Sequence, residues 1–146
     1  MSELTGVRCV KLPVTDLPKS VDWYRRVYGF TPTYEFPDEG GVVRGVAGDL
    51  PGCGYTGLAL RENPDAGGIA GLEVMLGVRD RAALEAWVAH LDEQGAEHSP
   101  VVEASIGWLV VVHDPDGHEH HLYTDERHGI DQSGRAGYGR AVADPA

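Results

Sequence analysis

The sequence is poor in the features that mark membrane, secreted and nucleic-acid-binding proteins. No apolar run approaches the length of a membrane span. The 12 basic residues, against 23 acidic ones, are scattered, so no basic patch is available to neutralise a phosphate backbone. The start of the chain lacks a basic region followed by an apolar core, so we expect a cytoplasmic protein whose cysteines, Cys9 and Cys53, are thiols. Neither a membrane nor nucleic acid is expected as a partner.

The composition is that of an ordinary folded domain. Hydrophobic residues make up 42% of the chain and charged residues 24%. A length of 146 residues predicts one domain, which is large enough for a core and can consist of two small halves. The net charge of −11 favours solubility and indicates no particular ligand.

The first half of the chain is predicted to form one strand, one helix and three further strands. Residues 7–14 alternate as a strand, and Asp16 is the expected N-terminal cap of a helix that ends at Gly29. Apolar residues recur within this helix at the spacing of one buried face. Segments rich in turn residues then separate the predicted strands 31–36, 42–47 and 55–60.

The second half repeats this order. A strand is predicted over residues 71–78, and Asp80 caps a second helix that ends near Gly95. Since Asp16 and Asp80 each follow a strand and cap a helix, the chain is interpreted as two modules of one architecture. The remaining predicted strands of this half are 99–104, 108–112 and 118–124.

Residues 127–146 differ from both modules. They contain several glycines and few large apolar side chains, so they bury too little surface to fold alone. We expect a flexible or flap-like tail.

The segment from His113 to Asp125 concentrates side chains that can ligate metals. Asp114 to Gly117 has the composition of a reverse turn, because proline, aspartate and glycine each favour one turn position. Since side chains alternate across a strand, the strand that follows has Glu119, His121 and Tyr123 on one face. Such a face is either a functional site or a solvated edge. The opposite face carries His118, His120 and Leu122, which are expected to be packing or surface groups.

Two stretches resemble the signatures of a known family. One is Cys9 to Ser20 with Asp22-Trp23-Tyr24 and Val27 to Phe30, and the other runs from Trp108 through the predicted turn to Leu122. Together they resemble the vicinal oxygen chelate superfamily, which includes glyoxalase I, extradiol dioxygenases, fosfomycin-resistance enzymes and bleomycin-binding proteins. The resemblance covers residues 6 to 125. One such scaffold hosts many functions, so the resemblance alone does not fix an activity.

The resemblance implies an α+β fold of two tandem βαβββ modules, whose eight strands form curled sheets around a cleft. Module 1 spans about residues 6–62 and module 2 about residues 69–125. They form a single glyoxalase-like domain, residues 1–126, followed by the tail, residues 127–146. The family also implies a homodimer.

The family's metal-ligand positions can be transferred by aligning its motifs on the two helix-capping aspartates and the closing turn. They fall on Cys9, Glu73 and His121, and a fourth position falls on Ala59, which cannot ligate a metal. A common family set is His, His and Glu, so this chain departs from it. A thiolate, a carboxylate and an imidazole can hold a divalent metal such as Zn, Fe, Mn or Ni, but because these are not the family's usual ligand types, a metal-free protein is favoured. Cys9 is also readily interpreted as a small buried residue.

Further residues are expected in the ligand cleft. His121 is the best single candidate, as a ligand or as an acid or base near neutral pH, and Glu73 is the other catalytic candidate. Tyr123 or Glu119 would assist proton transfer. Lys11 and Arg61 would add positive charge if they point inward, although both can instead reach solvent at strand ends. The full cleft set is Lys11, Arg61, Met75, Trp108 and Glu119, with Trp108 able to stack on a ligand.

Two functions follow from the sequence. The first is a glyoxalase/bleomycin-resistance-like protein that binds a small aromatic or anionic molecule in its cleft, without metal. The second is a metal-dependent lyase, isomerase or dioxygenase in which Cys9, Glu73 and His121 hold a metal that chelates vicinal oxygens of the substrate.

Overall fold

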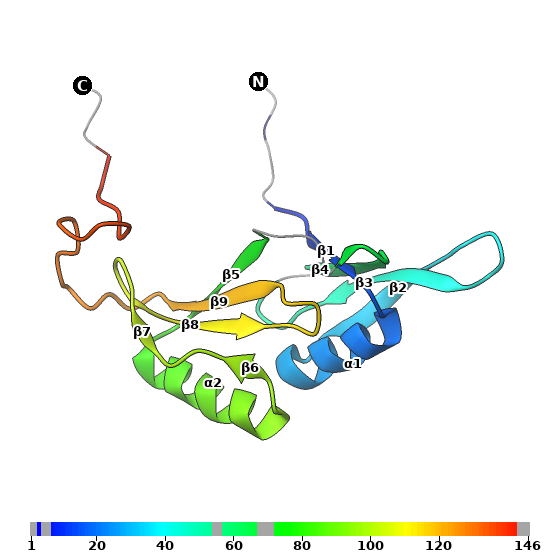
Figure 1. Ribbon diagram of the computed structural model, residues 1–146, viewed down its shortest axis with the longest axis horizontal. Helices are drawn as coiled ribbons and strands as arrows, with labels where there is room; N and C mark the ends of the chain where they lie inside the picture. The colour runs from blue at the N-terminus through cyan, green and yellow to red at the C-terminus, as the bar shows by residue number, and fades with distance from the viewer. Residues whose placement is uncertain (1–2, 4–6, 54–56, 67–71, 143–146) are drawn as a thin grey trace. The chain divides into compact units, whose positions relative to one another are not determined.

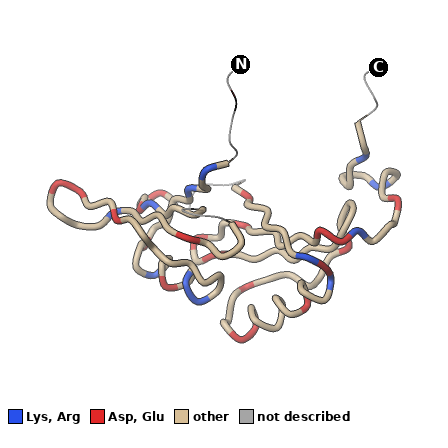
Figure 2. Tube along the Cα trace, turned by 180° about the vertical axis from the view of Figure 1, so that it is seen from behind, with Lys and Arg blue, Asp and Glu red and all other residues tan. Residues whose placement is uncertain are grey.

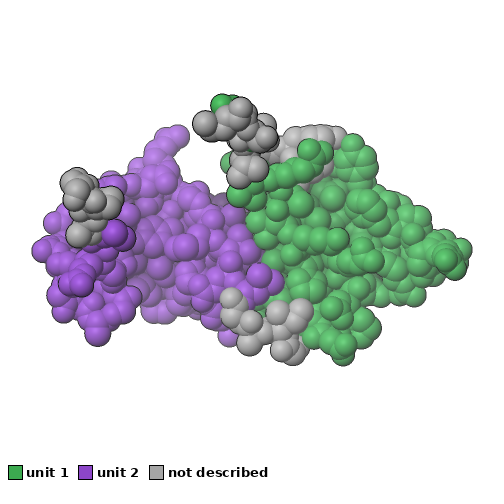
Figure 3. Space-filling model, turned by 90° about the horizontal axis from the view of Figure 1, so that it is seen from above, with its two compact units in different colours: residues 1–71, 114–118 green, residues 72–113, 119–146 purple. Residues whose placement is uncertain are grey.

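The computed structural model describes residues 3, 7–53, 57–66 and 72–142, and the chain divides into two compact units. Unit 1 comprises residues 1–71 with residues 114–118, and unit 2 comprises residues 72–113 and 119–146 (Figure 3). The predicted strand starts at residues 55 and 71 lie outside the described residues, as do residues 143–146 of the tail.

Unit 1 has the predicted order of strand, helix and three strands. Its sheet has the strand order β1-β4-β3-β2, in which β1 is parallel to β4 and the other neighbours are antiparallel. The first strand of the unit therefore pairs with the last (Figure 1). The elements are β1 (Val10–Val14), α1 (Leu17–Tyr28), β2 (Thr31–Pro37), β3 (Val43–Asp49) and β4 (Leu58–Glu62).

Helix α1 begins and ends at the predicted residues. The Asp16 carboxylate accepts a hydrogen bond from the Lys19 backbone amide (3.1 Å), which caps the first turn. Gly29 follows the helix in a left-handed conformation (φ 73°), which glycine adopts without strain. The apolar face of α1 covers one face of the sheet (Figure 1). The core of unit 1 includes Leu12, Val14, Tyr24, Val27, Phe30, Val46 and Leu60.

Unit 2 has the same plan. Its sheet has the order β5-β9-β8-β6, with β7 also paired to β8, and β5 runs parallel to β9. Asp80 caps α2 and Gly95 ends it, as predicted. The α+β fold of two βαβββ modules is therefore confirmed. The elements are β5 (Glu73–Val78), α2 (Arg81–Gln94), β6 (Glu97–His98), β7 (Val102–Glu103), β8 (Trp108–His113) and β9 (Glu119–Thr124).

Of the strand predicted over residues 99–104 only β7 forms, and the other short strand, β6, precedes the predicted range. Pro100 lies between them, and proline has no amide hydrogen to donate to a neighbouring strand. Ser99 still pairs with β8, because its amide donates to the Val111 carbonyl (2.8 Å) and its hydroxyl accepts from the Val111 amide (2.9 Å). The described residues therefore contain nine strands in two open sheets, where eight were expected.

The predicted turn at residues 114–118 belongs to unit 1. Asp114 is 6% exposed, and its carboxylate accepts hydrogen bonds from the Tyr24 hydroxyl (2.6 Å) and from the Asp116 and His118 amides (2.9 and 2.8 Å). The His118 imidazole donates to the Pro13 carbonyl (2.6 Å). Burial and the nearby Asp114 carboxylate raise the pKa of Tyr24, so the phenol stays protonated. The turn is thus tied to α1 and β1.

The tail is attached to unit 2 over its described residues, 127–142. The His128 amide donates to the Ile106 carbonyl (3.0 Å), and the His128 imidazole donates to the Ala104 carbonyl (2.7 Å). Gln132 is 5% exposed, and its side-chain amide donates to Glu103 (3.2 Å). These contacts hold the tail against the turn between β7 and β8.

Basic residues are scattered along the chain rather than gathered in one segment (Figure 2). Neither of the two helices in the described residues has the length and apolar run needed to cross a membrane.

Candidate ligand-binding site

The exposed face of the unit 2 sheet carries a row of ionisable side chains. Strand register places Glu73 beside Glu119, and Glu119 beside His113, across β5, β9 and β8. Residues paired in this way share a face of the sheet, and His121 follows two positions along β9 on that face. His120 and Leu122, in contrast, are buried on the opposite face, at 2% and 1% exposure. The predicted alternation of this strand is correct.

Glu119 is the centre of the row. It accepts a hydrogen bond from His121 (Nε2 to Oε2, 3.2 Å), and its other oxygen lies 3.6 Å from His113 Nε2. The hydrogen bond from His121 and the adjacent His113 lower the pKa of Glu119, so the carboxylate stays ionised at neutral pH. Ligand atoms of Glu73, Glu119 and His121 all lie within 4.8 Å of one another.

This donor set fits a divalent metal. Two carboxylate oxygens and one imidazole nitrogen suit Zn, Fe or Mn, and a three-residue set leaves positions for a substrate. Two of the three residues, Glu73 and His121, are those expected from the sequence. Glu119 was expected in the cleft and is here close enough to be the third ligand. We refer to Glu73, Glu119 and His121 as the acid–histidine cluster.

Unit 1 has a cavity of about 460 Å³ on the exposed face of its sheet. Cys9, Lys11 and Arg61, three of the expected site residues, line it with Ala59. The side chains of Lys11 and Arg61 make no hydrogen bond or ion pair within the described ranges, so no described carboxylate pairs with their charges. Arg44 also lines this cavity, but it is paired with Asp38 (3.1 Å) and Glu62 (2.7 Å).

Two rows of paired strand residues form the floor of the unit 1 cavity, and the small residues in them are Ala59, Ala47 and Gly45. Lys11, Ala59 and Ala47 are neighbours across β1, β4 and β3. In the next row, Arg61 and Phe36 flank Gly45 from β4 and β2. Phe36 is 54% exposed. A Cβ atom added to Gly45 would lie 3.7 Å from the Phe36 ring. The rows leave a shallow depression between an aromatic ring and two cations.

The expected metal ligands divide between the units. Cys9 is exposed and belongs to unit 1, whereas Glu73 and His121 belong to unit 2. The structure therefore brings Glu73 together with His121 and Glu119, and brings Cys9 together with Lys11 and Arg61.

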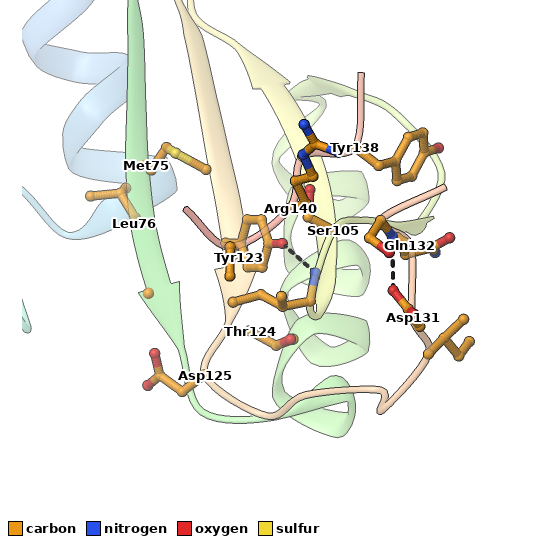
Figure 4. A pocket seen from close by; sticks show the side chains of 16 residues that line it. Met75, Leu76, Ser105, Tyr123, Thr124, Asp125, Asp131, Gln132, Tyr138 and Arg140 are labelled. Carbon is orange, nitrogen blue, oxygen red and sulfur yellow. Dashed lines mark hydrogen bonds between the residues drawn. The ribbon is translucent and has the colours of Figure 1, made fainter. Parts of the chain in front are cut away.

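Trp108 and Tyr123 lie on opposite faces of the unit 2 sheet. The Trp108 ring lies 5.2 Å from the Arg81 guanidinium and edge-on to His128, away from the acid–histidine cluster. Tyr123 shares the face of His121, and its hydroxyl accepts a hydrogen bond from the Ile106 amide (3.1 Å). Tyr123 and Met75 line a second cavity, of about 710 Å³ (Figure 4).

The sequence did not single out His113, Phe36 or Gly45 as site residues. His113 directly precedes the predicted turn, so a hairpin drawn through that turn would have paired it with Glu119. Phe36 and Gly45 fall on predicted strands, but their pairing depends on a register with bulges on β2.

A fold of two βαβββ units with ionisable side chains on their exposed sheet faces is that of the glyoxalase class of α+β proteins. A sequence profile of the Glyoxalase/Bleomycin resistance protein/Dioxygenase superfamily matches residues 6–122, and the chain belongs to this superfamily. The family expected from the sequence is confirmed. No curated protein sequence matches the chain.

Solved structures give the same fold. A glyoxylase/bleomycin resistance protein/dioxygenase domain from Frankia sp. EAN1pec has 24% identity and a TM-score of 0.69, covering 84% of this chain and 98% of that one. TnmS3, an antibiotic-binding protein from Streptomyces sp. CB03234, has 23% identity and a TM-score of 0.63, with 85% and 98% covered. The fosfomycin resistance protein FosX from Listeria monocytogenes, complexed with Mn(II) and sulfate, has 13% identity and a TM-score of 0.64, with 84% and 91% covered. At these identities the likeness concerns the fold.

Proposed function

We propose that the protein binds a small aromatic anion on the exposed face of the unit 1 sheet, without requiring a metal. The row of Phe36, Gly45 and Arg61 is the observation that carries this proposal. Gly45 adds no side chain to the cavity floor beneath Phe36, so a flat ring would lie against the exposed side of Phe36, while Arg61 is positioned to pair with a carboxylate or similar group. The solved structure of TnmS3, an antibiotic-binding protein with this fold, supports a ligand-binding function.

The charges around the cavity support an anion rather than a neutral ligand. Lys11 and Arg61 are two cations without partners in the described part of the chain, on a protein whose net charge is −11. A ligand anion would compensate both, and Phe36 would cover its apolar part. The cavity volume of about 460 Å³ lies within the range of small-molecule sites.

Calorimetric titration with 2-naphthoate and its uncharged analogue 2-naphthamide tests this proposal. The carboxylate is expected to bind about tenfold more tightly than the amide, because a hydrogen bond between charged groups contributes about 1.5–3 kcal/mol. Arg61→Gln and Lys11→Gln should each reduce this preference. Lys19→Gln, which removes an exposed cation from α1, is the matched control and should leave it unchanged. A preference for the carboxylate that is followed at the backbone amides of residues 11, 45 and 61 and survives both cavity substitutions would contradict the proposal.

A second candidate function is metal-dependent lyase, isomerase or dioxygenase chemistry. The acid–histidine cluster favours it, because three ligand-type atoms lie within 4.8 Å of one another. A divalent metal held there would polarise a substrate carbonyl. In that function Glu73 and His121 would hold the metal, and Tyr123 would donate a proton through its phenol, since its oxygen already accepts from the Ile106 amide. The relative FosX binds Mn(II).

Elemental analysis of protein purified without an affinity tag separates the two functions. Stoichiometric metal that is lost in His121→Ala would support the enzyme, and metal-free protein from metal-replete cells would exclude it. Two further variants distinguish the ligand sets. Loss of metal in Cys9→Ala but not in Glu119→Gln would support the set of Cys9, Glu73 and His121, and the opposite result would support the acid–histidine cluster.

A further inference from the structure

The tail forms one wall of the larger cavity in unit 2. This tail cavity, of about 710 Å³, lies between the ends of β5 and β9, the turn between β7 and β8, and residues 130–141 (Figure 4). Its volume is within the range of cavities that hold drug-sized molecules. None of the residues expected from the sequence to bind a metal lines it.

Exposed apolar side chains gather in the tail cavity. Met75, Ile106 and Ile130 are 61%, 52% and 48% exposed, and they come from three segments that are distant in sequence. Large apolar side chains that face solvent together, within one hollow, are characteristic of a binding surface rather than of scattered surface residues. A ligand with a flat apolar body would cover all three.

The wall is built by specific contacts. Gln132 is buried, and its side-chain amide donates a hydrogen bond to Glu103. His128 donates hydrogen bonds to the backbone carbonyls of Ala104 and Ile106. The Arg135 guanidinium lies over the Tyr138 ring, with its central carbon 3.9 Å from the ring centroid. Arg135 also donates a hydrogen bond to the Gln132 side-chain oxygen (3.4 Å). The tail is therefore held in place before a ligand arrives, which reduces the entropy lost on binding.

Two hydrogen-bond donors in the tail cavity remain available. The Tyr123 oxygen accepts from the Ile106 amide, so its own hydrogen is free to donate. Arg140 lines the cavity and has no hydrogen bond or ion pair to any described residue. Of the two carboxylates present, Asp131 is occupied by hydrogen bonds from Ser133. Asp125 lies below and to the left of Arg140 in Figure 4, beyond Tyr123 and Thr124.

We propose that the tail cavity is a second binding site for a flat, mainly apolar molecule that carries a carboxylate. Met75, Ile106 and Ile130 cover the apolar body, and the Arg140 guanidinium with the Tyr123 hydroxyl binds the carboxylate. The inference shares its ligand class with the proposed function, but it concerns different residues in the other unit. The tail thus helps to determine which molecules bind at this second site.

Nuclear magnetic resonance titration of the full chain with 2-naphthoate tests the inference. Backbone amides of residues 105–106, 123–125 and 130–141 are expected to shift, and Arg140→Gln should weaken the binding measured at these amides about tenfold. Arg127→Gln, an exposed cation of the same tail outside the cavity, is the matched control and should change it less than about twofold. Since Arg140 is exposed, the thermal midpoint should be unchanged, which separates lost binding from lost folding.

The outcomes distinguish this inference from the proposed function. Shifts confined to amides near Lys11 and Arg61 would overturn the tail site and leave the unit 1 site standing. Shifts confined to the tail cavity that Arg61→Gln does not change would support the tail site and overturn the unit 1 site. Equal binding of 2-naphthoate and 2-naphthamide at the tail cavity, or equal binding in wild type and Arg140→Gln, would refute the role of Arg140.

Discussion

Replacing Asp114 with alanine is expected to destabilise unit 1 strongly. The substitution removes the acceptor of three hydrogen bonds, from the Tyr24 hydroxyl and from the Asp116 and His118 amides. A hydrogen bond to a charged group contributes about 1.5–3 kcal/mol, and a buried hydroxyl left without a partner costs about 1–3 kcal/mol. These contributions are not additive, since water can reach the exposed turn. We expect Asp114→Ala to lower the free energy of unfolding by about 3–4 kcal/mol.

Tyr24→Phe separates the buried contact from the contacts within the turn. Tyr24 is 1% exposed, so the phenylalanine keeps its packing and removes one donor. The carboxylate retains two amide donors, and the expected loss is about 1–2 kcal/mol. In a double-mutant cycle, the two residues should show a coupling energy of about 1–2 kcal/mol.

Urea unfolding at pH 7, followed by tryptophan fluorescence, measures these losses. The Trp23 ring centroid lies 4.9 Å from that of Tyr24, so its emission reports on this region. Circular dichroism should be recorded in parallel, because two units can unfold in separate transitions. Losses below about 0.5 kcal/mol in both single variants, or no coupling between them, would refute the assignment of this contact as a main support of unit 1.

Three further predictions concern other parts of the chain. The hydrogen bond with Asp92 raises the pKa of His98 from its ordinary value of 6.5. The pair therefore stabilises the fold fully below pH 6.5, and this stabilisation is lost as the pH rises through the raised pKa. In urea titrations Asp92→Asn should lower the free energy of unfolding by about 0.5 kcal/mol at pH 6 and leave it unchanged at pH 9. Gly48→Ala should destabilise by about 2–4 kcal/mol, because its Cβ would lie 2.1 Å from the Thr31 carbonyl oxygen, whereas Gly134→Ala, with open space around it, should be nearly neutral in the same assay. Light scattering should give twice the 15.7 kDa chain mass if the predicted homodimer forms.

Local signals were enough to predict the two modules. Asp16 and Gly29 bound α1 because capping depends on residues within one turn of the helix end. Alternation was equally reliable on β9, where Glu119 and His121 lie on the exposed face and His120 is buried. Both signals act over a few residues, so a single sequence carries them.

Long-range arrangement was less predictable. The pairing of His113 with Glu119 depends on hairpin register, and the row of Phe36, Gly45 and Arg61 depends on three strands whose alignment includes bulges. The tail was expected to be flexible or flap-like because its composition is glycine-rich. Its attachment through Gln132 depends on a partner on β7 that no local pattern identifies.

The assignment of residues 114–118 to unit 1 has a consequence for protein synthesis. Tyr24 emerges from the ribosome long before Asp114, so the hydrogen bond from its hydroxyl to the Asp114 carboxylate cannot form until the turn has emerged. The amino-terminal module therefore gains this contact only after most of the second module has been synthesised. A nascent chain halted at the end of α2 should be cleaved by protease near α1, and resistance should appear once residues 114–118 have emerged from the ribosome.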